Sequence, residues 1–112
     1  MADQTAHLEL PYLAPSQAQK HVTHNEALRR LDGLVHLAVE SVGALSAPGS
    51  PVEGERHLLA ASPTGDWAGH GGDLAVFADG AWWFATPEIG WLAYDKASET
   101  LLVLKVAGWT SV

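Results

Sequence analysis

Apolar residues recur every three or four positions in the first third of the chain. Leu28, Leu31 and Val35 follow this spacing, which places them on one face of an α-helix. Two pairs ahead of this stripe match the spacing of a capping box, Ser16 with Gln19 and Thr23 with Glu26. The pattern predicts a helix whose apolar stripe holds copies of the chain together.

Gly33 interrupts the helical pattern. Glycine costs about 1 kcal/mol inside a helix and is preferred just beyond its end. If the helix stops there, Val35, Leu37 and Val39 alternate along the chain as strand residues do. Periodicity alone leaves both interpretations open. We favour a helix that ends near Gly33 and a strand that follows it.

The remainder of the chain alternates short apolar runs with turn residues. Residues 46–54 and 62–72 are rich in Gly, Pro and Ser and predict loops, and residues 56–61 between them predict a strand. Residues 74–78 begin a hairpin that Asp79 and Gly80 close, because this dipeptide tolerates the positive φ angles of a type I′ turn. Residues 91–94 and 101–106 predict a second hairpin.

The first hairpin is apolar on both faces. A two-residue turn sets Phe77 opposite Trp82 on one face and Val76 opposite Trp83 on the other. One face of such a hairpin must therefore meet a helix, a second sheet or another copy of the chain. The predicted fold class is α+β and mostly β. An extended arm over residues 1–15 precedes a single domain over residues 16–112, in which one helix leads into a small antiparallel sheet of hairpins.

Composition narrows the possible partners. The 112 residues suffice for one domain, and a net charge of −7 with only six Lys and Arg argues against nucleic acid or an anionic membrane. The chain has no cysteine, which excludes disulfides and thiolate metal sites. We find no signal peptide or spanning segment and expect a soluble protein made in the bacterial cytoplasm.

The polar run before the helix has two interpretations. Residues 17–26 can cap a helix and form one solvated face. The alternative is a hydrogen-bonded interface between copies, since amide side chains both donate and accept. The predicted interface comprises these polar residues and the apolar stripe: Gln19, Lys20, His21, Asn25, Leu28, Leu31 and Val35.

Residues 10–28, LPYLAPSQAQKHVTHNEAL, resemble the opening of a family of small domains found at the head of fibre and spike proteins of bacteriophages and gene-transfer agents. The likeness extends to later segments at residues 54–59, 64–70, 79–84 and 90–91. The resemblance favours the interface interpretation of the polar run. It implies the N-terminal attachment module of a longer receptor-binding fibre on the particle surface. For this chain we expect a spike or fibre base that self-associates, as a trimer or pentamer, and joins a capsid or tail protein to a separate receptor-binding fibre that contacts host polysaccharide.

Catalytic and metal chemistry are not expected. The sequence has no nucleophile elbow, phosphate loop or dinucleotide fingerprint, and His21 with His24 lacks the further ligands that a metal site needs. We therefore predict no enzyme, no metal and no cofactor.

Five tryptophans lie in the second half of the chain. Aromatic side chains fill cores and interfaces and also stack on sugars. Trp67, Trp83 and Trp109 are the candidates for partner or sugar contact. The alternative function is a carbohydrate-binding module for host surface polysaccharide.

Overall fold

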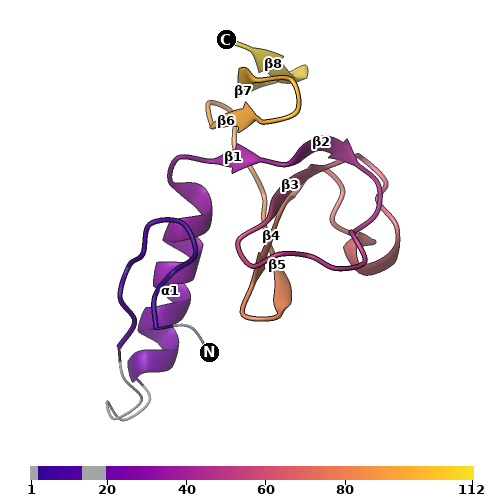
Figure 1. Ribbon diagram of the computed structural model, residues 1–112. Helices are drawn as coiled ribbons and strands as arrows, with labels where there is room; N and C mark the ends of the chain where they lie inside the picture. The colour runs from indigo at the N-terminus through magenta and orange to yellow at the C-terminus, as the bar shows by residue number, and fades with distance from the viewer. Residues whose placement is uncertain (1–2, 14–19) are drawn as a thin grey trace. The chain divides into compact units, whose positions relative to one another are not determined.

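The computed structural model describes residues 3–13 and 20–112, without the side chains of Lys20 and His21 (Figure 1). The chain divides by its contacts into two compact units, one ending at Val35 and the other beginning at His36. This boundary differs from the predicted one between residues 15 and 16. Each unit is described separately.

The first unit contains helix α1, Lys20–Leu34, and a loop formed by residues 3–13. The helix ends one residue after Gly33, so the prediction that it ends near this glycine is confirmed. The first of the two predicted capping boxes, Ser16 with Gln19, lies outside the described residues. Thr23 lies within the helix, where it does not act as the predicted cap.

The N-terminal residues fold back on themselves, in contrast to the predicted extended arm. Gln4 and Pro11 form an antiparallel bridge, and the Thr5 amide donates to the Leu10 carbonyl at 3.0 Å. Pro11, which has a fixed φ angle and no amide donor, is compatible with this turn. A buried carboxylate on α1 stabilises the turn, because Asp32 accepts hydrogen bonds from the amides of His7 and Leu8 at 2.9 and 2.6 Å.

The second unit contains two four-stranded sheets among the described residues. One has the order β1-β6-β7-β8 and the other β2-β3-β4-β5. Their strands are β1 Ala38–Val39, β2 Ser41–Ala44, β3 Arg56–Leu59, β4 Leu74–Ala78, β5 Ala81–Ala85, β6 Leu92–Asp95, β7 Thr100–Lys105 and β8 Gly108–Ser111. The predicted class, α+β and mostly β, is confirmed.

Both predicted hairpins are present with their predicted partners. In β4–β5, Phe77 pairs with Trp82 and Val76 with Trp83, and the turn residues Asp79 and Gly80 have φ angles of 54° and 78°. Strands β6 and β7 form the second hairpin. Strand β8, which the sequence analysis did not predict, pairs with β7 as a third antiparallel strand.

The sheets are mixed, whereas the sequence analysis predicted antiparallel hairpins alone. Strand β1 pairs parallel with β6, and β2 pairs parallel with β3. Only Glu40 separates β1 from β2, so the chain changes sheets over a single residue, and Figure 1 shows the two strands as successive arrows. Parallel partners that are far apart in sequence leave no local turn signature. Pattern analysis therefore missed these two pairings.

Both faces of the β4–β5 hairpin contribute to buried packing. On one face Ala75 packs with Leu59 and Trp67, the latter from a short 3₁₀ turn, Gly65–Trp67, and Trp82 and Phe84 border this cluster. On the other face Leu74 and Val76 are also buried. At these β4 positions the chain itself covers the hairpin, so a second copy is not required to bury them.

Candidate functional site

The apolar stripe predicted on the helix is partly open to solvent. Leu28 is half-buried, Leu31 is 52% exposed and Val35, the residue after the helix, is 39% exposed. Positions 28, 31 and 35 fall within one helical face at 100° per residue. Of the described features, this stripe corresponds best to the predicted association surface.

The polar residues assigned to the same surface are only partly described. Gln19 lies outside the described residues, as do the side chains of Lys20 and His21. Asn25 is 7% exposed. Its side-chain Oδ1 accepts a hydrogen bond from the main-chain amide of Leu13 at 2.9 Å, and its side-chain Nδ2 donates to the Leu13 carbonyl at 3.1 Å. Asn25 thus ties the N-terminal loop to α1. This intramolecular contact was not predicted, and its burial makes Asn25 a poor donor to a second copy.

The tryptophan candidates differ in accessibility. Trp67 is 0% exposed and forms an edge contact with Trp82 at 5.2 Å between ring centroids. Its assignment as a partner or sugar contact is therefore wrong, because its aromatic surface fills the core. Trp83 and Trp109 are half-buried.

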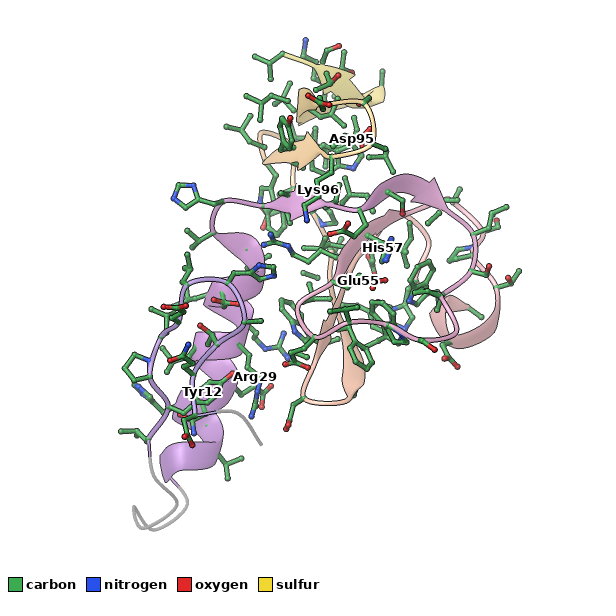
Figure 2. The ribbon with its side chains drawn as sticks, in the orientation of Figure 1. Tyr12, Arg29, Glu55, His57, Asp95 and Lys96 are labelled. Atoms are coloured by element: carbon green, nitrogen blue, oxygen red, sulfur yellow. The ribbon has the colours of Figure 1, made fainter. Side chains whose placement is uncertain are left out.

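A hydroxyl, an imidazole and a carboxylate form a continuous hydrogen-bonded line in the second unit. The Ser41 Oγ lies 2.6 Å from His57 Nδ1, and the Glu55 Oε2 lies 2.6 Å from His57 Nε2. Figure 2 labels Glu55 and His57. Ser41 on β2 is the registered partner of His57 on β3, and Glu55 precedes His57 by two residues. Ser41 and His57, as registered partners, lie on the same face of the β2–β3 pair, and Glu55, just before β3, reaches His57 through its hydrogen bond.

The Glu55 carboxylate is held in its ionised form. Burial is the largest single influence on its pKa and acts to raise it, but the hydrogen bond with His57, the Val52 amide and the charge of His57 together lower the pKa below the ordinary 4.5. The Val52 amide donates to Oε1 at 3.0 Å, so both carboxylate oxygens have a partner. An ionised carboxylate only accepts hydrogen bonds, so His57 Nε2 donates to it.

Aromatic rings surround the imidazole. His57 is 9% exposed, and its ring centroid lies 5.2 Å from that of Trp67 and 6.0 Å from that of Trp82. A buried imidazole needs partners at both nitrogens, and Ser41 and Glu55 supply them. The line can therefore support the core, and it also has the hydroxyl, base and orienting carboxylate of a nucleophilic site.

The sequence analysis missed this line for identifiable reasons. Glu55 and His57 stand two apart at the start of the predicted strand over residues 56–61, and that alternation was a usable signal. Ser41 offered none, since its contact depends on the parallel pairing of β2 with β3.

Other classes of site are absent from the part of the chain that the structure describes. Within residues 3–13 and 20–112, no three or more His, Asp or Glu residues gather in a way that could hold a metal ion. No described helix is both long and apolar enough to cross a membrane.

Comparison with known proteins places the chain in a family. Residues 24–110 match the family model described as "Protein of unknown function (DUF2793)". The chain belongs to this family. The DUF2793 match begins in α1 and includes every strand up to β8, so it contains Leu28, Leu31 and Val35 as well as Ser41, Glu55 and His57. Neither the curated proteins nor the solved structures contain a match to the chain.

Proposed function

We propose that this DUF2793 chain is a structural subunit of a bacteriophage-like or gene-transfer-agent particle. It serves as the base or adaptor of a head spike or tail fibre, at the particle surface. Identical copies associate, and the assembly connects a capsid or tail protein to a separate receptor-binding fibre. Its role in assembly is binding, without catalysis. The likeness of residues 10–28 to fibre and spike proteins supports this class of particle.

The exposed apolar stripe on α1 is the observation that best supports self-association. Leu31 and Val35 lie on the same helical face, and 52% and 39% of their surfaces are exposed to solvent. Complete burial of such a side chain stabilises by about 1.5–3 kcal/mol, so burying the remaining exposed part gives about 1 kcal/mol for each of these two side chains and about 2 kcal/mol for each copy. Several copies around a symmetry axis multiply this gain, as expected for a trimer or pentamer.

Imaging of the native particle tests the proposed location. The gene for this chain would be fused to a compact density label, and the purified particles would be imaged by cryo-electron microscopy. We expect extra density where a spike or fibre meets the particle. Label density that is absent from the particle, or spread through its interior, would contradict the proposal.

A carbohydrate-binding module is the second candidate. The half-buried Trp83 and Trp109 are the observation that favours it, since partly exposed aromatic faces stack on sugar rings. Quenching of tryptophan fluorescence by host surface polysaccharide tests it. Saturable quenching that Trp109→Ala removes, with the fold intact by circular dichroism, would favour this module over a purely structural base.

A further inference from the structure

We propose that Ser41 is an activated nucleophile that attacks small carboxylic esters, with His57 as general base and Glu55 as the positioning residue for the imidazole. This activity goes beyond the proposed assembly role and does not depend on it. It rests on the line of hydrogen bonds that joins Ser41, His57 and Glu55.

The direction of each hydrogen bond follows from the charge of Glu55. Because the carboxylate is ionised, the hydrogen between it and the ring belongs to His57 Nε2. A neutral imidazole then has its lone pair on Nδ1, and this atom lies 2.6 Å from the Ser41 Oγ. The hydroxyl therefore donates to Nδ1, which is the arrangement a base needs to take the serine proton.

The surroundings separate the base from bulk water but leave the nucleophile at an edge. His57 lies against Trp67 and Trp82, whereas Ser41 is only half-buried on β2, the outer strand of its sheet. Gly43, two residues further along β2, is exposed and carries no side chain. A substrate can approach from this edge, where a small acyl group meets no side chain at position 43.

The reaction balances with water as the only co-reactant. The Ser41 hydroxyl transfers its proton to His57 Nδ1 while Oγ bonds to the ester carbonyl carbon. The bond from that carbon to the alcohol oxygen then breaks, and the alcohol leaves with the proton from Nδ1. Water next attacks the acyl-serine and gives its proton to Nδ1. The Oγ–acyl bond breaks, Oγ regains the proton, and the carboxylic acid is released.

A fluorophosphonate probe tests the nucleophile directly in the full-length chain. Attack on phosphorus forms an Oγ–P bond and expels fluoride, so peptide mapping by mass spectrometry identifies the modified serine. We expect modification at Ser41, with no adduct on that peptide in Ser41→Ala. Ser46→Ala, at an exposed loop serine, is the matched control and keeps wild-type labelling. Wild-type Ser41 that is unmodified, or modified no faster than Ser46, overturns the proposal whether or not Ser41→Ala folds.

Hydrolysis of p-nitrophenyl acetate tests the base and its positioning residue. Glu55→Gln lowers kcat by about tenfold or more and leaves KM nearly unchanged, because the imidazole loses its orienting partner while the surface that meets the ester stays the same. Glu88→Gln, at an exposed carboxylate, leaves both constants unchanged. Equal kcat for Glu55→Gln and wild type, with both folded, overturns the role of the line. Light scattering on the same samples measures the mass of the assembly independently of the hydrolysis rate. A failure of the ester-hydrolysis proposal can therefore be distinguished from a failure of the self-association proposal.

Discussion

Gly71 lies so close to the main chain of Ala61 that an added β-carbon would overlap the Ala61 carbonyl. The Gly72 amide donates to the Ala60 carbonyl at 3.0 Å in the same region, so neither backbone segment can move away freely. We expect Gly71→Ala to destabilise the fold by about 1–3 kcal/mol, the usual cost of overpacking. Gly49→Ala, which meets open space, is the control. A thermal melt in which both variants match wild type would contradict this close approach.

Glu55 makes the free energy of unfolding depend on pH in the acidic range. Its pKa is lower in the folded chain than the ordinary 4.5, so its contribution is fully present above pH 4.5 and is lost as the pH falls through the folded-state pKa. Glu55→Gln removes the charge-assisted bond to His57, and we expect it to lower the free energy of unfolding by about 1–3 kcal/mol at pH 7.

Urea unfolding at pH 7, 4 and 3 measures this dependence. The gap between wild type and Glu55→Gln should narrow as the pH falls, while Glu88→Gln follows wild type throughout. A gap of constant size would mean that the charge of Glu55 does not contribute to stability.

At the scale of elements, two buried side chains of α1 hold the N-terminal loop. The Asn25 side chain accepts a hydrogen bond from the Leu13 amide and donates one to the Leu13 carbonyl. The Asp32 carboxylate accepts hydrogen bonds from the main-chain amides of two loop residues, His7 and Leu8. Asn25→Ala would leave the Leu13 amide and carbonyl without these partners, at a cost of about 1–3 kcal/mol. We expect faster hydrogen exchange at Leu13 in this variant than in Thr23→Ala, whose residue is exposed on the same helix. Equal exchange would indicate that the loop is held elsewhere.

Sequence analysis predicted those elements that a local signal specifies. The Asp79–Gly80 turn fixed the pairing of Phe77 with Trp82, and Gly33 marked the end of the helix, because each depends on neighbouring residues alone. The parallel pairing of Ser41 with His57 joins residues 16 apart and depends on the whole sheet. The hydrogen-bonded line was therefore beyond local patterns, as was the burial of Trp67.

At the scale of the whole molecule, the features that carry the two proposals lie in separate units. The open stripe of Leu28, Leu31 and Val35 belongs to the first unit, and the line of Ser41, His57 and Glu55 belongs to the second. A substitution in one unit should therefore leave the property of the other unchanged. This separation allows assembly and ester chemistry to be measured in the same preparation.

The helical stripe gives the sharpest test of assembly. Leu31→Asp places a carboxylate where neighbouring copies would bury it without a partner, so we expect the mass measured by light scattering to fall to that of one chain. Leu31 is 52% exposed within its own chain, and the cost in helix propensity is only about 0.5 kcal/mol, so the variant should still fold. Val22→Asp is the matched control. Val22 is 51% exposed but lies nine residues away, on the opposite face of the helix at 100° per residue, and this variant should keep the wild-type mass. An equal loss of mass in both variants would indicate general weakening of the helix. A wild-type chain that stays monomeric at high concentration would contradict self-association itself.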